Sequence, residues 1–402
     1  MRIGMLLDNS FPPDSRVENE AVSLINAGHE VFLFSLCFKN LQPLQETING
    51  IKVRRYPANK LIYKLSALAY SFPGYHALIK PKIRHFLNEN KIESLHIHDM
   101  MIAQAAFDVN KEFKLPVVLD LHENRPEIMR HYPWVNDWKG RLLVRRSRWA
   151  KMQTEFIKKA DRVIVVTEEA VQQAIFETGI SNRKIIAVPN TITPDIYFNY
   201  PIKQEVIDRF RDKFAVLYLG DTGLRRGTDL AIEAVAILKR TIPNVHLILV
   251  GKSKEDFILK NLAEKLGVAE EVSFEGWQDV SLFPSYTLAS EVCISPLVRN
   301  LHHDTTYANK IFQYMAMSRP IVVSDCPPQV RVAEEEQCGL VHQAGNAQDL
   351  ADKILELYRN SELRQTMGCN GQKAVRERYN WQQTSRDLIE MYNALALEFK
   401  LI

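Results

Sequence analysis

The chain has 402 residues, of which 46% are hydrophobic and 25% charged, and its formal net charge at pH 7 is +3. This length predicts two or three domains with sizeable cores, and the small charge argues against nucleic acid as a partner. The five cysteines are scattered without a Cys-x-x-Cys pair, so neither a zinc site nor a disulfide framework is indicated. With no signal-peptide pattern and no run of about eighteen apolar residues, we expect a cytoplasmic protein, able to rest at the inner face of the cell membrane.

The N-terminal half alternates between strand-like and helix-like segments. Residues 2–8 and 29–36 are apolar strands, and a helix from about Asp14 to Gly28 joins them into a βαβ unit. Further strands are predicted at 51–56, 94–98, 117–122, 162–167 and 184–190, with helices near 75–90, 101–112, 140–160 and 168–178. The first turn reads NSFPPDSRVENE and lacks G-x-G-x-x-G, which argues against a dinucleotide-binding site.

The alternation restarts at residue 215, after a proline-containing linker predicted at 191–213. The first turn of this second half has Gly220, Gly223 and Gly227 around Arg225 and Arg226. Such a turn lets the backbone approach a phosphate, and arginine binds phosphate bidentately, although a glycine-rich turn after a strand is also routine. Strands are expected at 246–251, 272–277 and 292–297, and helices after about residue 346.

Residues 304–325 combine a polar loop, a short helix and a buried strand. Apolar residues follow a helical spacing from Asn309 to Ser318, and Pro320 separates this helix from the strand IVVS. The free N–H groups at a helix start attract phosphate. Lys310, in the first turn, has the wrong charge for the helix dipole, which indicates that it faces an anion. An amphipathic helix with a solvated lysine explains the same pattern equally well.

The stretch NKIFQYMAMSRPIVVSD resembles the K-hydrophobic-x-E-Y/A-M-A-x-G-x-P-V-V pattern of the retaining glycosyltransferases of family 4, which have the double-Rossmann (GT-B) architecture. The segments GDTGLRRG, FPPDSRVENEA and VVLDLHENRPE resemble the family's phosphate loop, acceptor-side loop and strand-end histidine motif. The resemblance implies an α/β fold of two Rossmann-like, doubly wound domains facing a central cleft. Residues 1–200 would form the acceptor domain, 201–380 the nucleotide-sugar domain, and 381–402 a helix that packs back on the first.

The resemblance also implies roles for individual residues. Arg226, Lys310 and the helix start grip the leaving diphosphate, and His122 lies beside the transferred sugar, so these three residues form the expected catalytic set. The expected donor-binding residues are Gly220, Gly223, Arg225, Trp277, Asp304, Thr305, Tyr307, Ala308, Asn309 and Gln313. The expected acceptor-side residues are Asp14, Arg16, His98 and Glu123.

Three of these residues keep a second interpretation. Arg16 either meets a phosphate or is a solvent-facing charge in the first turn of its helix. Trp277 borders the nucleobase or belongs to the core. His98 is expected to be mostly structural, because a histidine at a strand end often bonds a neighbouring carbonyl.

The chain departs from the family where two glutamates, eight residues apart, flank the phosphate-binding helix start. Gln313 occupies the second position and can hydrogen-bond a ribose, but it carries no charge. Thr305 occupies the first, and both Thr305 and the adjacent Asp304 are candidates to replace the missing acid. The sequence contains no D-x-D pair. We therefore expect a metal-independent reaction with no cofactor, in which a UDP- or GDP-sugar is a substrate.

Residues 60–86 and 139–162 are rich in lysine and arginine with interleaved aromatic and aliphatic residues. Such segments can lie on an anionic membrane surface, or they form exterior helices that cover a sheet. The sequence thus favours transfer of a sugar from a nucleotide-sugar to a glycan or lipid-linked acceptor in cell-surface polysaccharide or glycoconjugate synthesis. A sugar-nucleotide epimerase on the same scaffold is one alternative. The missing acidic pair supports another, a non-catalytic nucleotide-sugar-binding relative.

Overall fold

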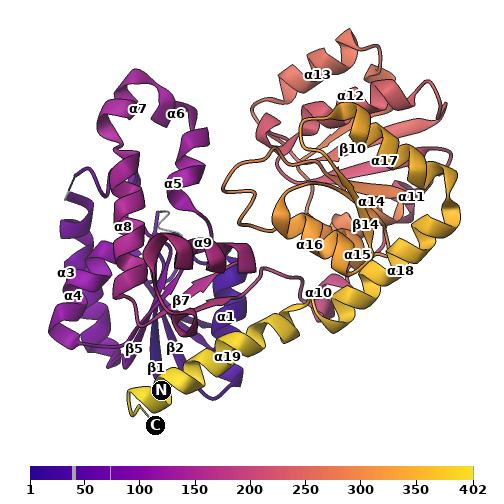
Figure 1. The fold of residues 1–402 in the computed structure, drawn as a ribbon. Coiled ribbons are helices and arrows are strands. Elements are labelled where there is room, and N and C mark those ends of the chain that lie inside the picture. The colour runs from indigo at the N-terminus through magenta and orange to yellow at the C-terminus, as the bar shows by residue number, and fades with distance from the viewer. Residues whose placement is uncertain (39–41, 73, 402) are drawn as a thin grey trace. The chain divides into compact units, whose positions relative to one another are not determined.

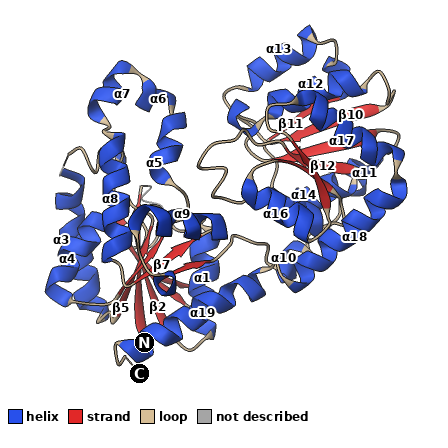
Figure 2. Cartoon of the chain, viewed as in Figure 1, coloured by secondary structure: helices blue, strands red, loops and turns tan. Residues whose placement is uncertain are grey.

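The computed structural model describes residues 1–38, 42–72 and 74–401, which divide into two compact units. Unit 1 comprises Met1–Pro189 and Ser385–Ile402, and unit 2 comprises Asn190–Thr384. The boundaries predicted from the sequence, at 200 and 381, both fall inside unit 2, near its two ends. Each unit is a sheet with helices packed on it (Figure 1; Figure 2). The predicted α/β class with two Rossmann-like domains is confirmed.

Within the described residues, unit 1 contains a sheet of eight strands in the order β3-β4-β2-β1-β5-β6-β7-β8, parallel except where β3 pairs with β4. Its strands are β1 (Arg2–Leu6), β2 (Glu30–Cys37), β3 (Gln45–Ile48), β4 (Ile51–Pro57), β5 (Ser94–His98), β6 (Val117–Asp120), β7 (Arg162–Val165) and β8 (Ile185–Ala187). Strand β3 was not predicted. It has no buried residue, so no hydrophobic period marks it in the sequence.

The helices of unit 1 begin and end at local signals. Asp14 caps α1, because its side chain accepts a hydrogen bond from the Val17 N–H, and Gly28 follows the helix end with φ +91°. The single helix predicted near 140–160 is instead two helices, separated by non-helical backbone at Val144 and Arg145. The helices are α1 (Ser15–Asn26), α2 (Lys60–Ser66), α3 (Gly74–Asn90), α4 (Ala103–Phe113), α5 (Arg125–Ile128), α6 (Pro133–Asn136), α7 (Trp138–Leu143), α8 (Arg146–Lys159) and α9 (Glu168–Thr178).

Unit 2 contains a parallel sheet in the order β11-β10-β9-β12-β13-β14. Its strands are β9 (Phe214–Leu219), β10 (Val245–Val250), β11 (Val272–Gly276), β12 (Val292–Ser295), β13 (Ile321–Ser324) and β14 (Gly339–His342). Its helices are α10 (Pro194–Tyr197), α11 (Gln204–Arg209), α12 (Thr228–Leu238), α13 (Asp256–Lys265), α14 (Phe283–Leu288), α15 (Lys310–Ala316), α16 (Pro327–Glu335), α17 (Ala347–Arg359) and α18 (Ser361–Glu377). The predicted linker at 191–213 therefore contains two short helices, α10 and α11.

The sheet of unit 2 is buried on both faces. Val216 of β9 packs into an apolar cluster with α12, α13 and α17, whereas the next residue, Leu217, packs into a second cluster with α14, α15, α16 and α18. This explains why β9 reads as an unbroken apolar run, since parallel strands covered on both sides have no polar face. In such sheets, ligands bind beyond the carboxyl ends of the strands.

Helix α19 (Trp381–Glu398) begins in unit 2 and continues into unit 1. It is labelled α19 in Figure 1 and lies at the yellow end of the colour scale. Leu388, Tyr392 and Leu395 are fully buried, which gives this helix one apolar face. Across the described residues, every helix is too short or too polar to traverse a lipid bilayer.

Candidate functional site

The carboxyl end of the unit 2 sheet borders a cavity of about 250 Å³. It is lined by Leu219, Gly220, Asp221, Arg226, Phe283, Tyr307, Ala308, Asn309, Lys310 and Gln313. Seven of these residues were predicted to bind the donor or its diphosphate. They come from the loop after β9 and from the start of α15, so the fold brings the two predicted phosphate-binding segments together.

Two glycines allow the loop after β9 to take its path. Gly220 has φ +111°, which a residue with a side chain rarely adopts, and a Cβ there would lie 3.5 Å from the Nζ of Lys310. Gly227 has φ +71°, and a Cβ there would meet the carbonyl oxygen of Pro296 at 1.8 Å. The loop after β9 therefore packs directly against the segment that follows β12.

The ammonium of Lys310 faces an aromatic ring and lies near a second positive charge. Its Nζ is 3.5 Å from the ring centroid of Tyr218, the penultimate residue of β9. Burial, and then the charge of Arg226, lower the pKa of Lys310 well below its ordinary value. Within the part of the chain that the structure describes, Lys310 has no hydrogen bond and no carboxylate at ion-pair distance. The solvated lysine considered in the sequence analysis is therefore not observed.

A buried histidine holds Arg226. His303 Nδ1 lies 2.7 Å from the carbonyl oxygen of Val298 and 3.0 Å from the side-chain nitrogen of Asn300. Its Nε2 lies 3.4 Å from Arg226 NH1, so His303 is a hydrogen-bond partner of Arg226. Sequence reasoning missed His303, because its position is unmarked by any motif. Arg225, a predicted donor-binding residue, pairs with Asp221 at 3.3 Å.

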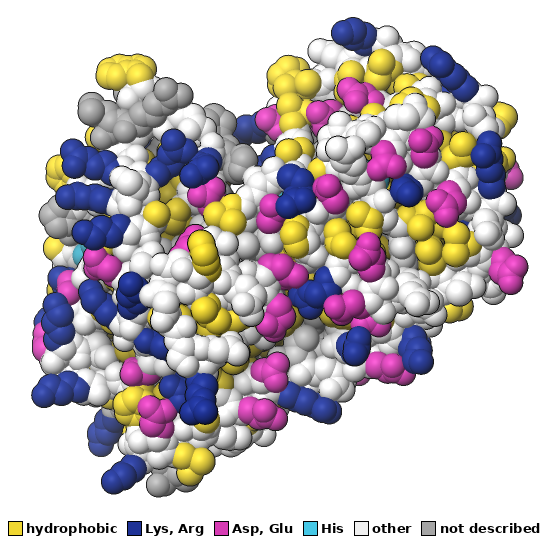
Figure 3. All heavy atoms as spheres, in the orientation of Figure 1, with side chains coloured by type: hydrophobic (Ala, Val, Ile, Leu, Met, Phe, Trp, Pro, Cys, Tyr) yellow, Lys and Arg dark blue, Asp and Glu magenta, His cyan; other side chains and the backbone are white. Residues whose placement is uncertain are grey.

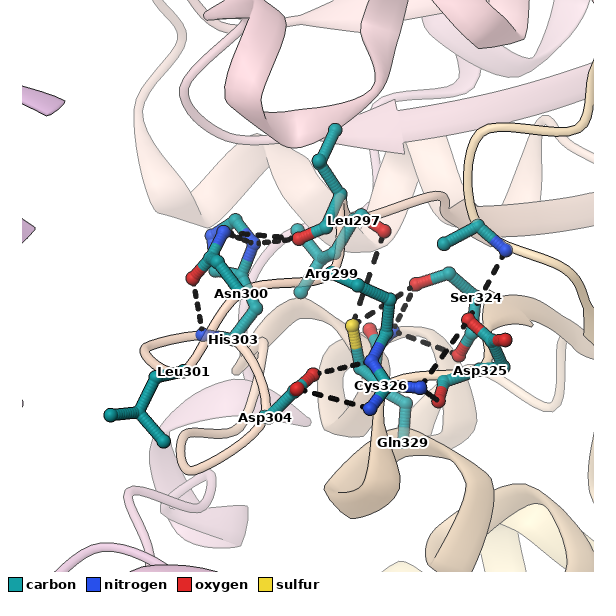
Figure 4. Close-up of polar contacts among 12 residues, drawn as sticks. Leu297, Arg299, Asn300, Leu301, His303, Asp304, Ser324, Asp325, Cys326 and Gln329 are labelled. Carbon is teal, nitrogen blue, oxygen red and sulfur yellow. Dashed lines mark hydrogen bonds and ion pairs between the residues drawn. The ribbon is translucent and has the colours of Figure 1, made fainter. Parts of the chain in front are cut away.

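The loop after β12 contains both candidates for the missing acid, Asp304 and Thr305, and Figure 4 shows Asp304 beside Arg299. Asp304 accepts hydrogen bonds from Arg299 at 2.7 and 3.0 Å, and Arg299 also donates to the carbonyl oxygen of Asp325. The hydroxyl of Thr305 is directed into its own loop, where it donates to the carbonyl oxygen of Leu301 at 2.7 Å. Of the two, only Asp304 supplies a carboxylate, and that carboxylate is already paired.

The remaining donor-side predictions lie outside the lining of the cavity. The Trp277 side chain is 73% exposed, so it is not a core residue, and Phe283 of α14 lines the cavity. Gly223 donates its N–H to the Asp221 carboxylate at 3.1 Å, which shapes the turn. No sequence motif singled out Phe283, because an aromatic residue at a helix start reads as core.

In unit 1, His122 lies just beyond the carboxyl end of β6. Its Nε2 is 2.9 Å from Asp120 Oδ2, and its Nδ1 is 3.5 Å from Asp99 Oδ2. Burial alone would lower the pKa of this imidazole, but the carboxylates of Asp99 and Asp120 outweigh burial and raise the pKa of His122 to about 10. The side chain is 17% exposed. At neutral pH, His122 is therefore an imidazolium that can donate hydrogen bonds but cannot act as a base.

Of the two interpretations of Arg16, the solvent-facing charge is wrong. Arg16 is 5% exposed, and its guanidinium donates to both oxygens of Asp120, at 2.8 and 3.1 Å, and to the carbonyl oxygen of Val188. It also forms an ion pair with Glu20 at 2.9 Å. The sequence placed Arg16 in the first turn of a helix but could not show that this turn packs over a buried carboxylate.

The other acceptor-side residues have partners of their own. Asp14 caps α1 through the N–H of Val17, at 3.1 Å. Glu123 forms an ion pair with Arg125. His98 is fully buried behind His122, with its Nδ1 3.2 Å from His122 Nε2. Sequence reasoning missed Asp8, a partly buried carboxyl two residues after β1, whose pKa is raised to about 6 by desolvation.

Family models and curated sequences connect this geometry to known proteins. The model described as "Glycosyl transferases group 1" matches residues 200–374, and the "Glycosyl transferase 4-like domain" model matches residues 13–191. The phosphatidyl-myo-inositol mannosyltransferase of Mycobacterium leprae is 21% identical, over 98% of this chain and 97% of that protein. An uncharacterized glycosyltransferase of Haemophilus influenzae is 24% identical, over 75% of this chain and 77% of that protein.

Solved structures establish the fold at lower identity. Sucrose-phosphate synthase from Thermosynechococcus elongatus has a TM-score of 0.77 at 17% identity, with 99% of this chain and 100% of that one covered. Anabaena HepE, solved in complex with UDP-glucose, has a TM-score of 0.72 at 16% identity, with 98% and 100% covered. Together with the two family models, these matches show that the chain belongs to the group 1 glycosyltransferases and has their GT-B architecture.

Proposed function

We propose that the protein is a retaining transferase that moves a sugar from a UDP- or GDP-sugar to a glycan or lipid-linked acceptor. The observation that carries the donor half of this proposal is the cavity of unit 2. There, Lys310 has no counter-ion within the described residues, and Arg226 lies on the same cavity wall. A half-buried cation without a carboxylate is costly unless an anion joins it. A diphosphate supplies that anion, and the solved complex of HepE with UDP-glucose supports a nucleotide-sugar as its source.

The proposed chemistry needs stabilised charge on the leaving group rather than a strong nucleophile. As the glycosidic bond to the diphosphate breaks, negative charge grows on the departing phosphate oxygens. Preorganised cations such as Lys310 and Arg226 stabilise that charge without reorganising. The absence of a D-x-D pair from the sequence supports a reaction that needs no metal ion.

Retention requires either a carboxylate nucleophile or attack from the same face as the leaving group. The two candidate carboxylates, Asp304 and Glu123, are both paired with arginines, which weakens them as nucleophiles. We therefore propose front-face attack, in which the acceptor hydroxyl passes its proton to the leaving phosphate oxygen. His122 is already protonated, so its proposed role is to donate a hydrogen bond to a sugar hydroxyl and orient the sugar.

The surface of unit 1 supports a lipid-linked acceptor. Trp138 and Tyr63 are 74% and 66% exposed, in or beside the segments 139–162 and 60–86. Exposed basic residues accompany them: Lys60, Lys64, Arg145, Arg146 and Lys151. Figure 3 shows many Lys and Arg side chains across the part of unit 1 that contains α3, α4 and α8. Basic side chains beside exposed aromatic residues fit an anionic lipid surface at the cytoplasmic face.

The first prediction concerns the diphosphate. Arg226→Ala and Lys310→Ala should each weaken the binding of UDP or GDP by roughly tenfold or more, because a charge-assisted hydrogen bond contributes about 1.5–3 kcal/mol. Isothermal titration calorimetry measures the affinity. Lys260→Ala is the matched control, because Lys260 also lies over an aromatic ring, Phe274, but outside the cavity. Unchanged affinity in both cavity variants would remove these residues from the donor site.

The second prediction concerns pH. A bound diphosphate favours the charged ammonium, so binding should raise the depressed pKa of Lys310 and take up a proton. UDP affinity should then fall as pH rises from the depressed pKa of the free protein's Lys310 towards the higher pKa of the bound form. Calorimetry in buffers of different ionisation enthalpy counts the protons. Lys310→Arg keeps the charge at all these pH values and should show less uptake than the wild type, whereas equal uptake would contradict the role of Lys310.

The third prediction concerns His122 and stereochemistry. His122→Ala should lower turnover by about a hundredfold through misplacement of the reacting groups, and it should leave UDP or GDP binding nearly unchanged. NMR coupling constants assign the product anomer, with a chelator present throughout. An inverted anomer would overturn the retaining mechanism, and activity lost with the chelator would overturn metal independence. Interconversion of the nucleotide-sugar without an acceptor would instead indicate an epimerase.

The fourth prediction concerns the membrane. The protein should co-sediment with phosphatidylglycerol vesicles, and this binding should weaken as salt rises, because exposed charges are screened within about 10 Å at 0.1 M salt. Charge reversal at Arg145 and Arg146 should reduce the bound fraction. The same reversal at Lys252 and Lys254, exposed in unit 2, is the control. Equal binding to phosphatidylcholine vesicles would contradict an electrostatic attachment.

A further inference from the structure

Behind His122, unit 1 buries a group of ionisable side chains that touches no solvent. Glu20 of α1, His96 and His98 of β5, and Asp120 of β6 are each 0% exposed. Each contributes one nitrogen or oxygen atom that lies within 4.8 Å of the atoms of the others. Removing so many polar groups from water is costly, and apolar side chains of the same size would hold these elements together at least as well. The group therefore calls for an explanation other than stability.

Asp120 is the centre of this group. Its Oδ1 accepts from Arg16 at 2.8 Å, and its Oδ2 lies 2.9 Å from His122 Nε2. Arg16 also contacts Glu20 at 2.9 Å, so one guanidinium serves two carboxyl groups. The Nε2 atom of His122 thus contacts the carboxylate of Asp120. The position of that carboxylate depends on Arg16 and on the other side chains packed around Asp120.

His96 connects this centre to the C-terminal helix. Its Nδ1 is 2.8 Å from the hydroxyl of Tyr392 on α19, and its Nε2 lies 3.4 Å from Glu20 and 3.8 Å from Asp120. Burial raises the pKa of Tyr392 well above its ordinary value, so the phenol keeps its proton and can donate it to Nδ1. His96 then carries its own proton on Nε2, where it faces the two carboxyl groups.

When Glu20 is neutral, the two positive groups, Arg16 and His122, are matched by the two carboxylates of Asp99 and Asp120. Burial raises the pKa of Glu20 to about 8, against the pull of Arg16. At neutral pH, Glu20 is therefore mostly a carboxylic acid, and Asp120 faces Arg16 and His122 as a carboxylate. Five groups face Glu20: Arg16 on its own helix, His96 on β5, Asp120 in β6 and His122 beyond it, and Tyr392 on α19.

We propose that Glu20, His96 and Tyr392 are positioning residues that act through Asp120 to hold His122 as a correctly oriented hydrogen-bond donor. This inference rests on the proposed role of His122 in sugar transfer. It gives α19 a part in the protonation and orientation of His122, because this helix contributes the Tyr392 hydroxyl that orients His96. A resident metal ion is the competing explanation for the group, but the guanidinium of Arg16 already contacts both carboxyl groups and supplies a positive charge there.

The test uses the full-length protein labelled with ¹⁵N-histidine, with the His122 signals assigned by their loss in His122→Ala. In the wild type, His122 should show a doubly protonated ring at neutral pH. Glu20→Gln should lower the pKa of His122 by about one unit, a tenfold change in proton affinity, because the variant lacks the negative charge that Glu20 acquires above pH of about 8. Tyr392→Phe should change the tautomer signature of His96, since Nδ1 loses its donor.

A second readout measures hydrolysis of UDP-glucose and GDP-mannose. Tyr392→Phe should lower kcat by about tenfold or more at neutral pH, because His122 is misplaced. Glu20→Gln should lower kcat only above pH of about 8, where wild-type Glu20 is charged and helps His122 to keep its proton. UDP or GDP affinity should stay unchanged in both variants, because unit 2 is untouched. Two matched controls should behave as the wild type in both readouts. Tyr75→Phe removes a buried hydroxyl that has no partner within the described residues. Glu18→Gln changes a partly exposed carboxylate on the same helix as Glu20, which accepts a hydrogen bond from Asn49 and lies outside the group.

The two readouts separate failure of this inference from failure of the proposed function. An unchanged His122 pKa in Glu20→Gln, together with unchanged His96 signals in Tyr392→Phe, would overturn the inference even in an active enzyme. A stoichiometric metal ion in the purified protein that is lost in Glu20→Gln would also overturn it. Absence of turnover in the wild type with every donor and acceptor would count against the proposed function, and the NMR signals would still decide the inference.

Discussion

The carboxylate of Asp120 is the group on which unit 1 is built. It lies at the end of a buried parallel strand, β6. There it forms one ion pair with Arg16 of α1 and another with His122. Burial would raise its pKa, but Arg16 and His122 outweigh burial and hold the pKa of Asp120 well below its usual range. A buried carboxylate that loses such a partner typically destabilises a protein by about 3–5 kcal/mol. One interaction thus serves both the packing of α1 and the charge of His122.

The charged groups around His122 in unit 1 and around Lys310 in unit 2 are arranged differently. In unit 1, the two positive groups of the site, Arg16 and His122, each meet carboxyl groups, so the charges around His122 are paired within the protein. In unit 2, Lys310 faces the ring of Tyr218 and has no carboxylate at ion-pair distance within the described residues, whereas the nearby Arg226 lies 3.8 Å from the carboxylate of Asp221. The first arrangement suits a group that orients a sugar, and the second suits a group that waits for an anion.

The loop after β12 shows how a departure from the family pattern is accommodated. Where the family has a glutamate, this chain has Thr305, whose hydroxyl satisfies a carbonyl in its own loop. The carboxylate of the preceding residue, Asp304, is held by Arg299, which also anchors the loop to the residue after β13, Asp325 (Figure 4). The loop is therefore tied down by its own ion pair, and its charge is neutralised rather than presented. This arrangement agrees with the front-face attack proposed above, which needs no free carboxylate at this position.

The sequence by itself determined the class of fold, most elements and seven of the residues that line the cavity of unit 2. Buried parallel strands appear as apolar runs, helix ends carry local signals such as Asp14 and Gly28, and Lys310 and Arg226 occur in short motifs whose chemistry depends on neighbours in the chain. Only the tertiary structure decided the protonation of His122, the burial of Arg16, and the positions of His303 and Phe283. These depend on contacts between segments that the sequence does not bring together: the bond between His96 and Tyr392 spans 296 residues. Burial and charge balance are properties of such assembled contacts, so no local pattern reveals them.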